Sequence, residues 1–227
     1  MALIHNNFIL INCCTADLNS AQWRGSVKGF EGKLGAGVIP LAVKDGEVLF
    51  LFQRVFSGRK NGYLIDFGGG LATGEGYLET AIREFIEETE TMYFSDDIKR
   101  ASRTAENVSS QVPLVEQLFE RTLRAYPDWW CKRQSENPLR PKDWCTYFIE
   151  FPYRDISALN REWKSDTSGR FRKRRQMIWV SADELLGLCN SEPEKLWKRV
   201  RQLENLSQRV YSIKQSLQGC DGLSAIR

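Results

Sequence analysis

The sequence predicts an α/β fold, and three observations support this prediction. Two apolar runs typical of β-strands, residues 35–43 and 48–54, are joined by an Asp-Gly turn. Apolar residues then recur at helical spacing over residues 77–89. Strand-like runs return at residues 144–151 and 177–180, so strands and helices alternate along the chain.

The remaining elements follow from turn, proline and capping signals. Residues 63–67 predict a third short strand ending in three glycines, where the backbone must turn sharply or approach something closely. Residues 113–126 predict an amphipathic helix with its proline near the first turn. Residues 127–142 are expected to be irregular. Ser181 begins a capping box that leads into another helix, and residues 192–217 predict a second long helix.

The composition is that of a globular protein with enough apolar material for a core. The chain has 227 residues, of which 42% are apolar and 27% charged, so neither disulfides nor a structural metal is needed. We interpret residues 1–227 as a single domain with an N-terminal extension (1–30), an insert (94–142) and a C-terminal helix (192–217). The net charge of +3 is too small to indicate nucleic-acid binding by itself.

Several classes of protein are made improbable by the sequence. His5 is the single histidine, which argues against a Cys/His zinc site and against Ser-His or Cys-His catalysis. The apolar run at residues 8–11 lacks the flanks of a signal peptide, and no apolar run reaches 18 residues. We therefore expect a cytoplasmic protein with no membrane partner. The six cysteines show no CxxC spacing: Cys13, Cys14, Cys131, Cys145, Cys189 and Cys220.

Three carboxylates on the helix at residues 77–89 suggest a metal site. Glu84, Glu87 and Glu88 lie at i, i+3 and i+4, outside the apolar arc, so they are neighbours. Like charges at this spacing cost roughly 0.2–0.5 kcal/mol per pair, which Arg83 can relieve by pairing with Glu87. Converging carboxylates are what a hard divalent cation such as Mg²⁺ requires. An acid-rich, solvated helix face without function is the alternative.

The glycines before this helix fit the same interpretation. Gly68–Gly70 and Gly74 leave main-chain groups open to a ligand, and the start of a helix favours phosphate. A triple glycine is also a common simple turn. Loop and helix together indicate a site for a metal and a phosphate.

The spacing of these residues resembles the Nudix box, whose pattern is Gly, five residues, Glu, seven residues, Arg-Glu, an apolar residue, any residue and Glu-Glu. A chance match of six fixed positions is expected on the order of once in 10⁵ chains of this length. The resemblance covers about residues 32–92 and 144–190. The positions in register are Gly69, Glu75, Arg83, Glu84, Phe85, Glu87 and Glu88.

The resemblance implies a Nudix-type α/β/α sandwich with a mixed sheet, together with a helical insert and a C-terminal helix. It implies a MutT-like pyrophosphohydrolase that uses Mg²⁺ or Mn²⁺ to cleave a nucleoside diphosphate linked to another moiety X. A nucleotide-derived small molecule would be the substrate, and a homodimer is a family-level expectation. The basic run Arg170–Arg175 keeps nucleic acid open as a partner.

The resemblance also implies roles for individual residues. Glu84, Glu87, Glu88 and the Gly68 carbonyl would be metal ligands. Glu84 or Glu87 would accept a proton from the attacking water, Arg83 would orient the glutamates, and Glu75 would brace the loop. The expected substrate-binding residues are Arg54, Arg59, Gly69, Gly70 and Glu75.

Two positions depart from the pattern. Glu90 stands where Gly is usual and Thr91 where an aliphatic residue is usual, so we expect the helix to lengthen or the chain to be rerouted. Phe67-Gly68-Gly69 replaces Pro-Gly-Gly, and we expect a looser loop.

Other features leave alternatives open. The basic run 170–175 suits either phosphate or RNA, or is a solvated loop. Residues 106–110 lack the substrate signatures of Nudix subgroups, so the X group is not identified. The alternative function is a catalytically weak Nudix-fold protein that binds nucleotide or RNA as a regulator. Four tryptophans could stack a base or lie in the core: Trp129, Trp130, Trp144 and Trp163.

Overall fold

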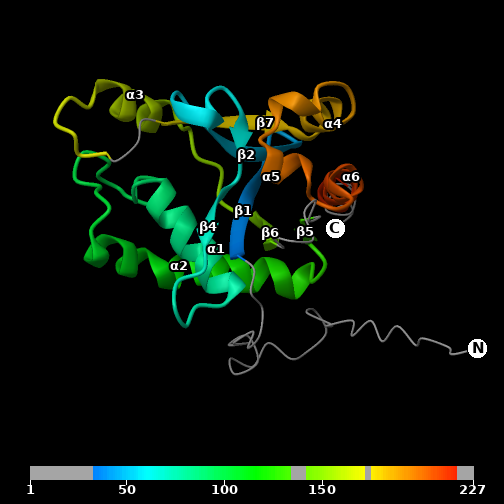
Figure 1. Cartoon of the computed structure of the whole chain (residues 1–227), viewed down its shortest axis with the longest axis horizontal. Helices are drawn as coiled ribbons and strands as arrows, with labels where there is room; N and C mark the ends of the chain where they lie inside the picture. Colours follow the sequence, from blue (N-terminus) through cyan, green and yellow to red (C-terminus); the bar gives the residue numbers. More distant parts are fainter. Residues whose placement is uncertain (1–32, 134–141, 172–174, 219–227) are drawn as a thin grey trace, which may run out of the picture.

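A mixed sheet of seven strands lies between two groups of helices, as the computed structural model shows (Figure 1). The structure describes residues 33–133, 142–171 and 175–218. The predicted N-terminal extension (1–30), with its expected strand at residues 8–11, lies outside these described residues.

The sheet is built around two long central strands. β1 pairs with β6 in parallel and with β2 and β4 antiparallel, so the sheet is mixed. Its order is β3-β2-β1-β6-β5, and β7 pairs with β2. The strands are β1 (Lys33–Lys44), β2 (Glu47–Val55), β3 (Leu64–Ile65), β4 (Phe67–Gly70), β5 (Trp130–Lys132), β6 (Lys142–Glu150) and β7 (Arg175–Ser181).

Helices cover both faces of the sheet. One face packs against α1, α2 and α3, and the other packs against α4, α5 and α6. This arrangement confirms the predicted α/β sandwich. No helix in the described part of the chain is long and apolar enough to cross a membrane. The helices are α1 (Tyr77–Glu88), α2 (Ala105–Ala125), α3 (Ser157–Ser165), α4 (Ala182–Ser191), α5 (Lys198–Arg201) and α6 (Leu206–Gln218), with 3₁₀ turns η1 (Gly58–Lys60) and η2 (Pro193–Lys195).

The β1–β2 hairpin forms as the Asp-Gly turn predicts. Asp45 and Gly46 both have positive φ, 52° and 76°, which matches the twist of the flanking strands. The predicted strand at residues 63–67 is divided, because β3 pairs with β2 whereas β4 pairs with β1. The chain therefore passes from β2 to β1 just before the glycines.

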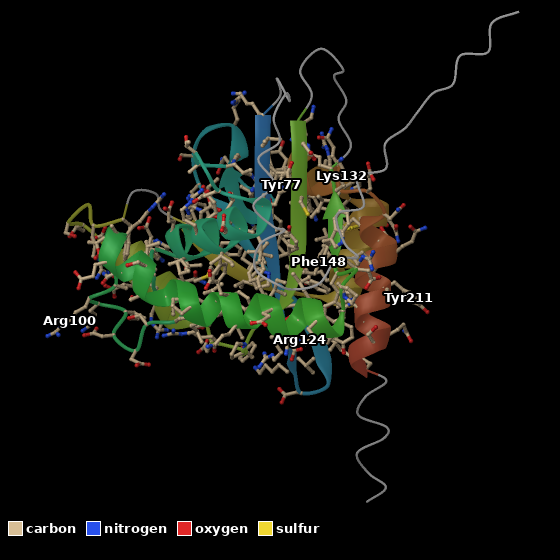
Figure 2. The ribbon with its side chains drawn as sticks, turned by 90° about the horizontal axis from the view of Figure 1, so that it is seen from below. Tyr77, Arg100, Arg124, Lys132, Phe148 and Tyr211 are labelled. Atoms are coloured by element: carbon tan, nitrogen blue, oxygen red, sulfur yellow. The ribbon has the colours of Figure 1, made fainter. Side chains whose placement is uncertain are left out.

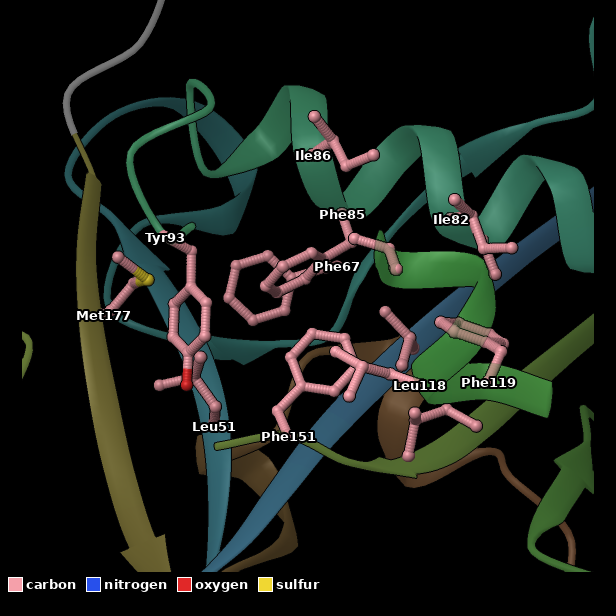
Figure 3. Close-up of a cluster of buried hydrophobic side chains, with 14 of the residues drawn as sticks. Leu51, Phe67, Ile82, Phe85, Ile86, Tyr93, Leu118, Phe119, Phe151 and Met177 are labelled. Atoms are coloured by element: carbon pink, nitrogen blue, oxygen red, sulfur yellow. The ribbon is translucent and has the colours of Figure 1, made fainter. Parts of the chain in front are cut away.

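An aromatic core fixes α1 against the sheet. Phe85 is fully buried and makes edge-to-face contacts with Phe67 of β4 and with Phe151 (Figure 3). Ile82 and Ile86 are buried beside it, one turn apart on the helix. Because Phe67 is the first residue of β4 and Gly68–Gly70 follow it, this core positions the glycines relative to the helix.

The glycines at residues 68 and 69 are needed for close approach. A Cβ at Gly68 would lie 2.4 Å from the Ala36 carbonyl oxygen, and one at Gly69 would lie 2.2 Å from the Glu84 carboxylate. Both residues pair with β1 as part of β4. The expectation of a loosened loop is therefore wrong at these positions, because sheet pairing holds the backbone.

The helix that carries the Nudix-box resemblance, α1, ends where that pattern ends, although the usual glycine is missing. α1 stops at Glu88, and Glu90 and Thr91 adopt φ of 52° and 60°. The Thr91 N–H donates to the Ile86 carbonyl at 2.9 Å, as in a glycine-terminated helix. The expected lengthening is wrong: the left-handed turn is kept, at a cost of about 1–2 kcal/mol per residue.

The insert contains more regular structure than the sequence predicts. α2 begins at Ala105, eight residues before the expected start at residue 113, since Thr104 accepts a hydrogen bond from the Asn107 N–H and caps the helix. Pro113 consequently lies inside the helix, not in its first turn. Figure 2 shows α2 running across the molecule between the labelled Arg100 and Arg124. β5, within the insert, is a further element that we did not predict, and so is α3, which follows β6.

The predicted long helix at residues 192–217 is instead three short elements, η2, α5 and α6. Leu196 forms a bridge with Leu64, and the Trp197 N–H donates to the Leu64 carbonyl at 2.9 Å. Asn205 has φ of 57° ahead of α6. Contacts with the sheet therefore interrupt a segment that local periodicity alone would make continuous.

Candidate active site

The charged residues of the box helix fall into two groups. We call Glu75, Arg83, Glu84, Glu87 and Arg103 the outer cluster; they lie at the partly exposed edge of α1. A second group, joined to Glu88, lies between α1 and the sheet. Because the helix turns about 100° per residue, the adjacent Glu87 and Glu88 point into different surroundings.

Arg83 is clamped by Glu75 in the outer cluster. Its Nε donates to Glu75 Oε1 at 2.6 Å and its Nη2 to Oε2 at 2.9 Å. This bidentate geometry is the strong form of the ion pair, and it raises the pKa of Arg83. Burial opposes ionisation of Glu75, but hydrogen bonds from Arg83, the Ala72 N–H and the Thr80 hydroxyl outweigh it and lower the pKa of Glu75.

Two carboxylates converge on a single nitrogen of Arg83. Nη1 lies 2.8 Å from Glu84 Oε1 and 3.4 Å from Glu87 Oε2. Both glutamate side chains are 15% exposed. Glu84 also packs directly on Gly69. One positive group is thus shared by two negative ones at the surface of the site.

Arg103 supplies a second guanidinium to the outer cluster. It lies just before the Thr104 cap of α2 and forms an ion pair with Glu87 Oε2 through Nη2. With three carboxylates and two guanidinium groups, the outer cluster has a net charge of −1. An additional cation would therefore be attracted here.

Glu88 is the centre of the second group, which we call the inner network: Gln53, Asp66, Glu88, Arg175, Arg199 and the main chain of Gly68. Glu88 Oε2 accepts from Gln53 Nε2 at 2.6 Å and from the Gly68 N–H at 2.8 Å. Oε1 lies 2.9 Å from Arg175 Nη1. Burial opposes ionisation, but Arg175, Arg199 and the Gly68 N–H lower the pKa of Glu88 overall.

A buried ion pair completes the inner network on the other side of Gly68. Arg199 Nη2 lies 2.6 Å from Asp66 Oδ1, and its Nη1 donates to the Gly68 carbonyl at 3.1 Å. Asp66 is fully buried, and the Arg199 guanidinium stacks on the Trp144 ring at 4.0 Å. Two carboxylates and two guanidinium groups balance, so the inner network has no net charge.

The two groups differ in how well they fit a divalent metal. Glu84 and Glu87 fit, because the shared Arg83 nitrogen shows that both can approach one cation. The Gly68 carbonyl also fits, since an oxygen that accepts one hydrogen bond retains a second lone pair. Glu88 fits less well, because Arg175 already balances its charge and its Oε2 accepts hydrogen bonds from Gln53 and the Gly68 N–H. Among the described residues, no three acidic, histidine or cysteine side chains form a ready metal cluster.

Two cavities adjoin the box helix. One, of about 230 Å³, lies beside Glu88; its lining includes three cationic side chains, Arg59, Lys60 and Arg175. The other is a groove of about 620 Å³ between α1 and α2; Glu87 and Arg103 lie on its wall together with apolar residues such as Ile82. The insert therefore shapes the surface beside the outer cluster.

Not every predicted site residue is brought to this place. Arg59 lines the cationic cavity, but Arg54 follows Gln53 on β2 and points to the opposite face of the sheet. Trp129, Trp144 and Trp163 are buried in the core and unavailable for base stacking.

The first and last residues of the basic run, Arg170 and Arg175, form ion pairs within the protein. Arg170 forms an ion pair with Glu162, while Arg175 forms one with Glu88. Residues 172–174 lie outside the described residues. In the described part, the run therefore contributes to internal contacts.

Sequence reasoning missed most of the inner network and Arg103. The sequence indicates Arg175 only as the end of a basic run. Asp66, directly before the glycine strand, carried a signal in hindsight: an acid flanked by apolar strand residues requires a buried partner. Nothing in the local sequence distinguishes Arg103 or Arg199 from the arginines that lie on the surface.

Comparison with known sequences finds one distant relative. No protein-family model matches the chain. The uncharacterized protein L534 of Acanthamoeba polyphaga mimivirus is 24% identical over 208 residues, covering 77% of this chain and 64% of the relative. The chain thus spans less than two thirds of the length of that relative.

Solved structures similar to this chain include Nudix hydrolases. A C. elegans Ap4A hydrolase in a binary complex is 13% identical, with 82% of this chain and 98% of that chain covered and a TM-score of 0.43. The M. smegmatis Nudix hydrolase RenU is 14% identical, with 82% and 90% covered and a TM-score of 0.41. The NUDIX domain of Shewanella oneidensis NrtR, complexed with ADP ribose, is 10% identical, with 81% and 89% covered and a TM-score of 0.37.

Proposed function

We propose that this protein is a Nudix-type pyrophosphohydrolase that cleaves the diphosphate of a nucleoside diphosphate linked to another moiety X. One observation carries the proposal: Glu84 and Glu87 converge on a single cationic nitrogen within a cluster that retains net negative charge. This is the electrostatic setting in which a divalent cation and a diphosphate bind together.

We assign the metal-holding role to Glu84, Glu87 and the Gly68 carbonyl, with Mg²⁺ or Mn²⁺ as the ion. When bound, such an ion neutralises phosphate charge and lowers the pKa of water. Glu84, against Gly69, is our candidate to accept the proton of the attacking water. Arg83, held by Glu75, keeps Glu84 oriented.

We assign Glu88 to positioning and not to metal binding, although the resemblance also places it among the ligands. Its hydrogen bond from the Gly68 N–H helps to hold the residue whose carbonyl is a proposed ligand. Removing the charge of Glu88 would leave the Arg175 guanidinium buried without its charge partner.

The cationic cavity is our candidate site for substrate phosphate. Arg59 and Lys60 are supplied by η1, and Arg175 is almost fully buried with an Nε that has no hydrogen-bond partner among the described residues. Guanidinium groups recognise phosphate oxygens through paired hydrogen bonds. We keep Gly69, Gly70 and Glu75 as proposed substrate-binding residues, because Gly69 packs on Glu84 and both Gly70 and Glu75 accept hydrogen bonds from Arg83.

The experiment is product release with Mg²⁺ or Mn²⁺ from a panel of ADP-ribose, NADH, coenzyme A, dinucleoside polyphosphates, nucleoside triphosphates and capped RNA. Glu84→Gln is the catalytic variant and Glu120→Gln, an exposed change on α2, is the matched control. We expect Glu84→Gln to lower the rate about 10²–10⁴-fold and the control to leave it unchanged. Equal rates for wild type and Glu84→Gln would contradict the proposal.

A binding protein without turnover is the second candidate, and the inner network favours it. Arg175 forms an ion pair with Glu88, which the resemblance assigns to metal. No cleavage of any compound, with some of them still raising the melting temperature, would support this alternative.

A further inference from the structure

The ion pair between Arg103 and Glu87 places a cationic side chain where the proposed metal would bind. We propose that Arg103 competes with the metal for Glu87 until an anionic phosphate draws it away, so that metal and substrate bind together. This inference rests on the proposed function, because it concerns the same carboxylates.

The contact itself is specific. Arg103 Nη2 pairs with Oε2 of Glu87, the same oxygen that faces Arg83 Nη1 at 3.4 Å. A carboxylate oxygen surrounded by two guanidinium groups presents little negative potential to a third cation. The ion pair between Arg103 and Glu87 must therefore be weakened or broken before Glu87 is fully available to a metal ion.

The two arginines lie on different segments of the chain. Arg83 is fixed by both oxygens of Glu75 and by the Gly70 carbonyl, so it stays with the loop. Arg103 belongs to the segment between α1 and α2, outside the box, and its side chain is 26% exposed, close to the 23% of Arg83. A partly exposed ion pair is weak enough to be exchanged for another partner.

The groove beside Arg103 and Glu87 gives a phosphate access to their ion pair. Glu87 and Arg103 both line the groove between α1 and α2, so a phosphate entering it meets the guanidinium directly. Phosphate carries more charge than a carboxylate and accepts bidentate hydrogen bonds from arginine. The exchange frees Glu87 for the metal, and the metal in turn attracts the phosphate.

This coupling is reciprocal. If phosphate raises the affinity for metal, metal raises the affinity for phosphate by the same factor, which for coupled sites is typically about 5–150-fold. Removing the Arg103 charge should therefore raise the affinity for metal in the absence of phosphate and reduce the effect of phosphate.

The test is titration of the full chain with Mn²⁺ alone, followed by paramagnetic resonance of free Mn²⁺, for wild type and Arg103→Gln. The matched control is Arg100→Gln. Arg100 lies three residues before Arg103, carries the same charge, and has a side chain that is 91% exposed. We expect Arg103→Gln to bind Mn²⁺ at least about fivefold more tightly than wild type. Arg100→Gln and the charge-conserving Arg103→Lys should both remain close to wild type.

A second titration includes inorganic phosphate. A series without protein measures the binding of Mn²⁺ by phosphate itself, which is then subtracted. Phosphate should raise the Mn²⁺ affinity of wild type severalfold and that of Arg103→Gln much less. Adding Glu87→Gln to Arg103→Gln should abolish the gain in affinity.

Three outcomes would overturn the inference: equal Mn²⁺ affinity for wild type and Arg103→Gln, an equal gain for Arg100→Gln, or equal phosphate effects in the two proteins. These outcomes are distinct from failure of the proposed function. A panel without hydrolysis refutes the enzyme but leaves the Mn²⁺ difference standing. Hydrolysis with equal Mn²⁺ affinities refutes only the role of Arg103.

Discussion

Glu87 and Glu88 are consecutive residues of one helix, yet they belong to two different electrostatic environments. Glu87 lies in the outer cluster, beside a groove, with arginines that are partly exposed. Glu88 lies in the inner network, where both oxygens have partners and the charges balance. The comparison shows that a motif of repeated carboxylates does not assign the same task to each of them.

The difference has a physical origin. Buried charges are tolerated only when each is paired, and in the inner network Glu88 pairs with Arg175 and Asp66 with Arg199. Partly exposed charges can exchange partners with water, metal or substrate at little cost. We therefore expect substitutions in the inner network to affect stability, and substitutions in the outer cluster to affect binding and turnover.

The largest effect on stability should come from the buried pair of Arg199 and Asp66. Arg199→Met leaves a fully buried carboxylate without its cation, so we expect a loss of about 3–5 kcal/mol in the free energy of unfolding. Urea denaturation would measure it. Arg201→Met, in the same short helix but exposed, is the control and should change stability by less than about 0.5 kcal/mol.

Adding Asp66→Asn to Arg199→Met should recover part of that loss, because the uncompensated charge is removed. If the single variant were as stable as the Arg201→Met control, the inner network would not be a structural element. The contrast with the outer cluster would then be lost.

A smaller effect is expected for binding in the cationic cavity. Arg59→Gln removes an exposed guanidinium from its lining, and we expect KM for a cleaved substrate to rise about tenfold, which is roughly 1.4 kcal/mol. The rate constant kcat should change much less. Arg124→Gln, an exposed change toward the far end of α2, is the control. If Arg59→Gln and Arg124→Gln had the same KM, Arg59 would not belong to the substrate-binding site.

The smallest effect is a change in the dependence of stability on pH. The pKa of Glu88 is lowered in the folded protein, so its ionised form contributes stability that is fully present above the unfolded value of about 4.3 and is lost as pH falls below it. Glu88→Gln should therefore make the decline in acid shallower, as measured by urea midpoints between about pH 3 and 6. Glu120→Gln, with an exposed side chain, should leave the slope unchanged.

Much of the fold follows from local patterns in the sequence. The hairpin at Asp45–Gly46 and the helix carrying Phe85 were predicted because turn chemistry and apolar spacing both act over a few residues. The break before α6 was not, because it depends on a bridge between Leu196 and the distant Leu64. The turn at Glu90 was not either, because tertiary contacts impose a conformation that its own side chain disfavours.

The candidate site divides in the same way. The spacing of Glu84 and Glu87 was enough to expect that they are neighbours, since helix geometry alone determines it. The inner network could not be expected, because Arg199 and Asp66 are 133 residues apart. The metal-binding, catalytic and substrate-binding roles remain predictions.

The most direct test of the central claim compares Glu87→Gln with Glu88→Gln, measuring hydrolysis and urea unfolding on the same preparations. We predict that Glu87→Gln loses at least about 10²-fold in rate while its free energy of unfolding stays within about 1 kcal/mol of wild type. We predict that Glu88→Gln loses about 3 kcal/mol or more of stability. A Glu88→Gln protein as stable as wild type but inactive would contradict the account and place Glu88 among the metal ligands.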